Sequence, residues 1–333
     1  MGRYNETEYM YASARIRAAE GKDTAGVRLE RMLDCRSPEQ LFRAVMDFGF
    51  LAEERQVPAS LTEALDLAWE DGVSLVRENV PEPSLYDFIL YKYDCNNIKV
   101  ALKANILGLD YSALYYRCGT FSPDGLTERL AEGDTTGLPH HMAEAVTEAR
   151  TAYAAVGEGR VIDFCLDKAC YADMAAQTEK NGVPLFCEYV SMRADITNIL
   201  SSVRLASRGA KEASAAVLEQ AFVPGGSLPY TFFLEDGCLG YEGLREKMDA
   251  GVLREAVDRI LTQGEAARPE KEFDNVLYRL MNRDRYVPFG VHIPAVFLTN
   301  REAELKNCRI IGAALEAGIT GAGLRERIRV DYV

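Results

Sequence analysis

The sequence predicts an all-helical protein made of three similar helical bundles. Two observations carry this prediction. Apolar residues recur at helical spacing along most of the chain, and a stretch that runs from a proline to a glycine occurs three times. Signals for β-strands are nearly absent, the exception being the short run SLPYTFFLEDG at 227–237. The 333 residues suffice for two or three domains of ordinary size.

Each repeated stretch begins at a proline and ends at a glycine. The three stretches run from Pro83 to Gly108, from Pro184 to Gly209 and from Pro294 to Gly318. Proline is favoured at the first position of a helix, and glycine is favoured just past the last position, where the backbone turns left-handed. We therefore expect three long helices capped by these six residues, each roughly 36 Å long at about 1.5 Å per residue.

The three stretches align on an asparagine that follows an acidic residue by three positions. The pairs are Asp94 with Asn97, Asp195 with Asn198, and Glu304 with Asn307. Residues three apart lie on one face of a helix. Buried acids and amides need hydrogen-bond partners, and such a pair can fix how a neighbouring helix docks. We interpret the pairs as a repeated joint between helices, with a catalytic role as the alternative.

The spacing of the asparagines divides the chain into three consecutive units. The intervals are 101 and 109 residues, so units of this size account for the whole sequence. The predicted units are 1–110, 111–213 and 214–333, with loops at TFSPDG and VPGGS. Further stretches with helical spacing precede each long helix, as expected for helical bundles.

Composition and charge limit the function. The formal net charge is -13, so we expect no nucleic-acid partner and no general attraction to anionic lipid. The start of the chain lacks the apolar segment of a signal peptide, and no stretch is long and apolar enough to span a bilayer. The eight cysteines are scattered without a CxxC motif, which indicates free thiols in a reducing cytosol.

No motif for nucleotide binding, metal binding or covalent catalysis is found in the sequence. The segment EGKDTAG lacks the earlier glycine of a phosphate-binding loop, and GITGAG follows a predicted helix where a dinucleotide site needs a strand. His140 and His141 are predicted to lie in a surface loop without an acidic partner. We therefore expect no catalytic residue, no metal and no cofactor.

Basic residues recur along the three predicted long helices. The candidate contacts to a partner are Lys99, Lys103, Arg204, Arg208 and Arg309. In an acidic chain they can form patches for acidic partner surfaces, but ion pairs within the chain explain them equally well. In the second stretch Leu200 replaces the basic residue that follows the asparagine by two positions, so a partner contact through this column would differ there.

The segments YASARIRAAEGK, YDCNNIKVALKA and REAELKNCRIIGAALEAG resemble the C subunit of the bacterial and archaeal V/A-type ATPases, which is related to the d subunit of the eukaryotic V-ATPase. The resemblance extends from Tyr4 to about Arg327. It implies a non-catalytic protein of three helical bundles in a pseudo-threefold, funnel-like arrangement. It also implies a central-stalk position between the shaft subunits and the membrane rotor ring, in the cytoplasm and peripheral to the membrane, in a complex that couples ion transport to ATP hydrolysis or synthesis.

Two other classes of function remain open. One is an α-helical enzyme with a cleft between its bundles that uses Asp94, Asp195 or Glu304, and the other is a soluble scaffold unconnected with ATPases. Substitution of the acids distinguishes them, because loss of folding or assembly indicates a joint, whereas a folded protein that has lost a reaction indicates an enzyme. A rotor adapter needs stiffness and broad interfaces more than chemistry, which agrees with long capped helices.

Overall fold

The computed structural model describes residues 4–20, 24–52, 55–207, 211–235, 237–264 and 267–329. Within these ranges the regular structure is helical, and extended backbone pairs only at an isolated antiparallel bridge between Leu234 and Cys238. The all-helical prediction is therefore confirmed. The β-like run at 227–237 instead contains the 3₁₀ turn η4 (Tyr230–Phe233). Among the helices in these ranges, none combines the length and apolar character needed to cross a bilayer.

The chain divides into two compact units. Unit 1 comprises Met1–Ser84 and Arg268–Val333, and unit 2 comprises Leu85–Ala267. Unit 1 thus joins the two ends of the chain, whereas unit 2 is its continuous middle. The division into three consecutive units at 1–110, 111–213 and 214–333 stays a prediction.

Unit 1 is organised around one long helix. This helix, α14 (His292–Glu316), packs against the first four helices of the chain and against α13, and its buried side chains include Leu305 and Ile311. Ser37 and Ser60 start two of the partner helices, because each side chain accepts a hydrogen bond from a backbone N–H of the first turn. The other elements are η1 (Glu6–Tyr9), α1 (Met10–Ala19), α2 (Ala25–Leu33), α3 (Pro38–Asp47), α4 (Leu61–Asn79), α13 (Pro269–Met281) and α15 (Ala322–Arg325).

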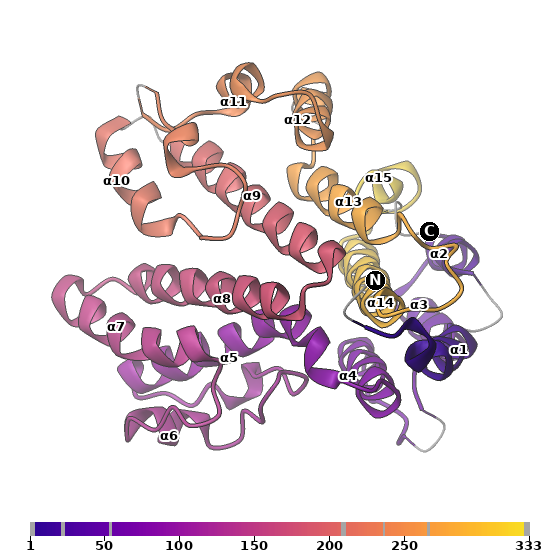
Figure 1. The fold of residues 1–333 in the computed structure, drawn as a ribbon. Helices are drawn as coiled ribbons and strands as arrows, with labels where there is room; N and C mark the ends of the chain where they lie inside the picture. Colours follow the sequence, from indigo (N-terminus) through magenta and orange to yellow (C-terminus); the bar gives the residue numbers. More distant parts are fainter. Residues whose placement is uncertain are drawn as a thin grey trace. The chain divides into compact units, whose positions relative to one another are not determined.

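Unit 2 is organised around α8 (Arg160–Asn181), which packs against α5, α7, α9 and α10 (Figure 1). An aromatic cluster fills the space between α5 and α9, where the rings of Phe88 and Phe186 lie 4.9 Å apart and Tyr189 meets Phe88 edge-on. The other elements are α5 (Asp87–Leu107), η3 (Ser112–Leu114), α6 (Leu126–Ala131), α7 (His140–Val156), α9 (Pro184–Ala206), α10 (Lys211–Ala221), α11 (Tyr241–Lys247) and α12 (Val252–Gln263).

The three prolines lie at the starts of the long helices α5, α9 and α14. Pro184 is the first residue of α9, and Pro294 is the third residue of α14. Pro83 opens the 3₁₀ turn η2 (Pro83–Tyr86), after which α5 begins at Asp87. All three positions precede the point at which a helix needs a backbone N–H donor, so the missing proton of proline costs little.

The glycines that were expected to end these helices lie at two of the three predicted ends. Gly108 follows α5 with a left-handed φ of 62°, and Gly318 follows α14 with a φ of 73°. A side chain is disfavoured in this region of backbone space, which is why glycine suits both ends. Gly209 and the neighbouring Arg208 lie outside the described residues.

Candidate functional site

Each of the three repeated asparagines holds one residue of a later segment by two hydrogen bonds. The bonded pairs are Asn97 with Tyr116, Asn198 with Val223, and Asn307 with Arg329. In every pair the side-chain Oδ1 accepts from the backbone N–H, and Nδ2 donates to the carbonyl of the same residue, at distances of 2.7 to 3.0 Å. The buried amide thus satisfies both backbone groups of one residue, as another peptide would.

The aspartates of the first two pairs hold residues four or five positions beyond those bonded by the asparagines. Asp94 accepts from Thr120 N at 2.9 and 3.1 Å and from the Thr120 hydroxyl at 2.7 Å. Asp195 accepts from Ser227 N at 3.1 Å, from its hydroxyl at 2.6 Å and from Leu228 N at 2.9 Å. Because both carboxylates are buried, these donors replace the water that would otherwise solvate the charge.

A glycine precedes each of the two hydroxyl residues, and the contact with the aspartate explains its presence. A Cβ at Gly119 would overlap Oδ1 of Asp94, and a Cβ at Gly226 would overlap Oδ1 of Asp195. Neither glycine has a positive φ, so the requirement is for the absence of a side chain and not for an unusual backbone. The local signal of this site is therefore glycine followed by threonine or serine, which reasoning from the sequence missed.

Alanine at position 119 is expected to lower the free energy of unfolding by roughly 2–4 kcal/mol, because the added Cβ displaces the Asp94 carboxylate from its donors. Urea unfolding followed by circular dichroism measures this change. The matched control is Gly159→Ala, at a position with open space and an ordinary φ of -59°. If the clash with Asp94 causes the loss, Gly119→Ala will lower the free energy of unfolding much less in an Asp94→Ala background. Equal losses in the two backgrounds would contradict this explanation.

The third acidic residue has a different partner. Glu304 on α14 accepts from Arg28 on α2, with Nε–Oε1 at 2.5 Å and Nη2–Oε2 at 3.2 Å. The side chains are only 6% and 3% exposed. This pair joins two helices, whereas the bonds of Asp94 and Asp195 described above join a helix to a following loop. The geometry of those two aspartates favours a structural role, since a general acid or base must reach a substrate.

The two candidate partner contacts on α5 form ion pairs with α8. Lys99 Nζ lies 2.6 Å from Asp167 Oδ1, and Lys103 Nζ lies 2.6 Å from Asp163 Oδ1. Burial alone lowers the pKa of Lys99, but Cys95 and Asp167 outweigh it and raise the pKa overall. The lysine is therefore charged at neutral pH, and the two pairs tie α5 to α8 across one turn of each helix.

The arginine candidates differ in their surroundings. Arg309 Nη2 lies 2.7 Å from Asp66 Oδ1 on α4, and both side chains are about half exposed. Such an exposed pair contributes about 0–1 kcal/mol, so exchange for a partner carboxylate would cost little. Arg204 is exposed on α9, and Arg208 lies outside the described residues. A partner contact through these residues or through Lys99 and Lys103 stays a prediction.

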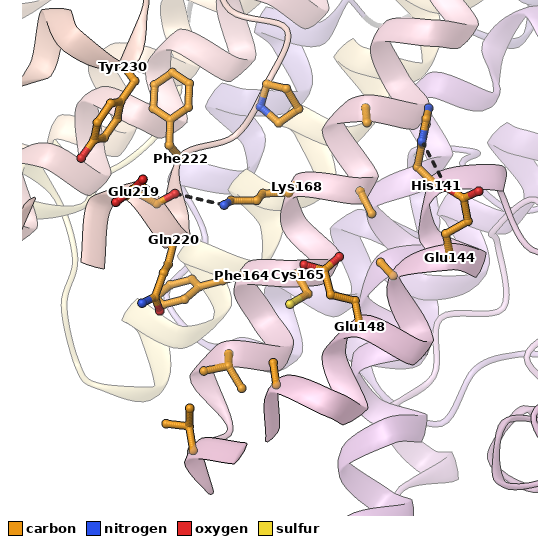
Figure 2. A pocket seen from close by; sticks show the side chains of 17 residues that line it. His141, Glu144, Glu148, Phe164, Cys165, Lys168, Glu219, Gln220, Phe222 and Tyr230 are labelled. Atoms are coloured by element: carbon orange, nitrogen blue, oxygen red, sulfur yellow. Dashed lines mark hydrogen bonds and ion pairs between the residues drawn. The ribbon is translucent and has the colours of Figure 1, made fainter. Parts of the chain in front are cut away.

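A groove of about 820 Å³ in unit 2 is lined by α7, α8 and the segment 219–230 (Figure 2). Lys168 crosses toward that segment, and its Nζ donates to the carbonyl of Glu219 at 3.0 Å. Cys165 also lines the groove, but burial raises the pKa of its thiol and the charge of Glu148 adds to this effect. An activated cysteine nucleophile needs a lowered pKa, so the groove does not have this feature of a thiol enzyme.

The sequence predicted that the two histidines beside this groove lie in a surface loop, and this prediction is wrong. His140 and His141 are the first two residues of α7, and both face Glu144, at 3.7 and 4.0 Å. Proline at 139 and the Asp173 carboxylate, which accepts from two backbone N–H groups of the first turn, explain the early helix start. In the described part of the chain, His140, His141 and Glu144 are the only group of three His, Cys, Asp or Glu side chains close enough to share a metal ion, and His141 is the half-buried member.

The described residues form a helical fold in which buried polar side chains hold segments of the same chain in place. A model of the ATP synthase (C/AC39) subunit family matches residues 12–327. The chain belongs to this family, and the resemblance found in the sequence is confirmed.

Several relatives are named as subunits of ATP synthases or of an ATPase. The C subunit of the A-type ATP synthase of Thermococcus gammatolerans is 23% identical over 97% of this chain and 90% of that protein. The C subunit of the A-type ATP synthase of Methanocaldococcus jannaschii is 25% identical over 91% of this chain and 82% of its own. The C subunit of the V-type sodium ATPase of Enterococcus hirae is 22% identical over 77% and 78%. Each of these names describes one subunit of an ATP synthase or of an ATPase.

Proposed function

We propose that this chain is the central-stalk subunit of a V/A-type rotary ATPase, where it joins the shaft subunits to the membrane rotor ring. The observation that carries the proposal is the family match over residues 12–327, together with relatives named as the C subunits of A-type ATP synthases and of a V-type sodium ATPase. In this role the chain is not an enzyme. It transmits torque, while nucleotide chemistry and ion binding take place on other subunits.

The proposed architecture is a pseudo-threefold, funnel-like set of three bundles at 1–110, 111–213 and 214–333. Its support is the recurrence of one bonding pattern, since a buried asparagine on each long helix satisfies both backbone groups of a residue 19, 25 or 22 positions later. A similar bond at a similar place in three helices is what triplication of one structural unit would leave.

Stiffness is the property that a torque-transmitting subunit needs, and the buried polar bonds provide it. A loop held by an amide and a carboxylate cannot move without breaking several hydrogen bonds at once. The ion pairs of Lys99 and Lys103 add resistance to sliding between α5 and α8. We place the protein in the cytoplasm, peripheral to the membrane through its complex, and assign exposed cations such as Arg204 and Arg309 to partner contacts.

Purification from native membranes in mild detergent tests this function. A tagged copy of the chain should recover the ATPase head, the shaft and the rotor ring in one complex, identified by mass spectrometry. An untagged strain, processed in the same way, controls for membrane proteins that adhere to the resin. Recovery of the chain alone, from membranes in which the ATPase is intact, would contradict the proposal and favour a scaffold or an enzyme.

A further inference from the structure

Unit 1 contains a second polar site, a pocket of about 340 Å³ beside the Arg28–Glu304 pair. Residues of α1, α2, α14 and the segment 282–286 line it. The charged lining consists of four arginines and two glutamates, with a formal charge of +2: Arg17, Arg28, Arg285, Arg301, Glu20 and Glu304. A positive pocket in a chain of net charge -13 focuses a local field that attracts anions.

Arg301 is the unusual member of this lining, because it is only 6% exposed. Its guanidinium lies over two aromatic rings, 4.2 Å from the centroid of Phe50 and 5.3 Å from that of Phe297. It forms no hydrogen bond and no ion pair with any residue in the described ranges. A guanidinium has five N–H donors, and Arg301 lines the pocket, so acceptor oxygens of a ligand in the pocket would match these donors.

The carboxylates that line the pocket are bonded to other arginines. Both oxygens of Glu304 accept from Arg28, and Glu20 Oε2 lies 3.0 Å from Arg17 Nη1. Burial lowers the pKa of Arg301, and the charge of Glu304 opposes this effect. An anion beside Arg301 would relieve the cost of burying its charge.

The surroundings of Arg301 suit an acceptor that approaches in the plane of the guanidinium. Its donors lie in that plane, whereas the aromatic rings contact it through stacking, which uses no N–H group. The amides of Asn282 and Asn300 bond to each other at 2.7 and 2.9 Å and form a polar wall of the same pocket. The edge of the Arg301 guanidinium is therefore the position at which an acceptor in the pocket would bind.

We propose that this pocket binds a phosphate group, with the Arg301 guanidinium as its principal hydrogen-bond donor. A phosphate dianion matches the formal charge of +2 on the lining, and its oxygens accept the two parallel N–H bonds that arginine offers. The phosphate comes either from free inorganic phosphate or from a small phosphate monoester. This inference stands apart from the proposed function, because it needs only the isolated chain.

Isothermal titration of the purified full chain with inorganic phosphate, against chloride at equal ionic strength, tests the site. We expect saturable binding that Arg301→Met weakens by at least about tenfold, the loss typical of one charge-assisted hydrogen bond. Arg160→Met is the matched control, since it removes one positive charge from an exposed ion pair with Glu158 in unit 2. Its affinity should stay within about twofold of the parent.

Further variants keep the test decisive. Arg301→Lys retains the charge but loses the planar fork, so it should bind with intermediate affinity. If circular dichroism shows that Arg301→Met does not fold, Arg285→Met replaces it, because Arg285 is an exposed residue of the pocket wall and its loss should weaken binding about threefold.

Glycerol 3-phosphate distinguishes the two sources of phosphate. Tighter binding of this ester than of inorganic phosphate assigns the pocket to a monoester, and equal binding assigns it to the free ion. No saturation up to about 10 mM of either ligand, or equal affinity of the parent and the folded Arg301 variants, would overturn the proposal. Neither result depends on whether the chain co-purifies with an ATPase.

Discussion

Glutamine at position 304 is expected to lower the free energy of unfolding by roughly 3–5 kcal/mol. The substitution keeps the shape of the side chain but removes the negative charge that lies against the buried Arg28 guanidinium. Arg301 increases this loss of stability, because its charge is also stabilised by the Glu304 carboxylate. Urea unfolding monitored by circular dichroism measures the loss, and a lower melting temperature should accompany it.

The comparison with an exposed ion pair isolates the effect of burial. Glu30 and Arg325 lie 2.6 Å apart, but their side chains are 58% and 55% exposed. Glu30→Gln should therefore cost much less stability than Glu304→Gln. The double variant Arg28→Met with Glu304→Leu removes both buried charges and should recover much of the stability lost in the single variant. Equal losses from Glu30→Gln and Glu304→Gln would contradict this explanation.

Alanine at position 97 is expected to cost roughly 2–4 kcal/mol of unfolding free energy, because both backbone groups of Tyr116 lose their partners. The adjacent Asn96 provides the matched control, since it lies on the same helix, is only half-buried and undergoes the same substitution. Asn96→Ala should change stability by less than about 1 kcal/mol. Hydrogen exchange at the Tyr116 amide should accelerate in the first variant alone. Similar effects of the two substitutions would mean that the bonds to Tyr116 do not matter.

The positions of the long helices were predictable from the sequence because their signals are local. A proline in the first turn, apolar spacing and a terminal glycine act within a few residues of one another. The start of α9 at Pro184 and the left-handed Gly108 follow from these signals alone. The start of α5 differs from the proline by four residues, because Pro83 opens a 3₁₀ turn before the helix.

The partners of the polar residues were not predictable in the same way. Helical spacing shows that Asp94 and Asn97 share a face, but their partners lie in a loop whose path is set by tertiary structure. The Arg28–Glu304 pair joins positions 276 residues apart, and no local pattern relates them. The sequence contains only a weak signal for the ion pairs of Lys99 and Lys103 with α8. Asp163 and Asp167 have the same four-residue spacing as the two lysines.

The β-like run at 227–237 shows how a polar site overrides an apparent strand pattern. Ser227 and Leu228 donate their backbone N–H groups to Asp195, and Pro229 has no N–H to donate. Three successive residues therefore have no backbone N–H group free to donate to a neighbouring strand. The chain turns into a short 3₁₀ helix at Tyr230, and among the described residues of this run only Leu234 takes part in extended pairing.

The construction of unit 1 from both ends of the chain has a consequence for synthesis. Helices α1 to α4 leave the ribosome well before α14, yet α4 packs against α14. The continuous middle, Leu85–Ala267, can fold in the meantime as a unit of its own. Until Arg268–Val333 is made, core side chains of Met1–Ser84 such as Leu65 and Trp69 lack part of their packing, and this exposed apolar surface makes the nascent segment prone to aggregation.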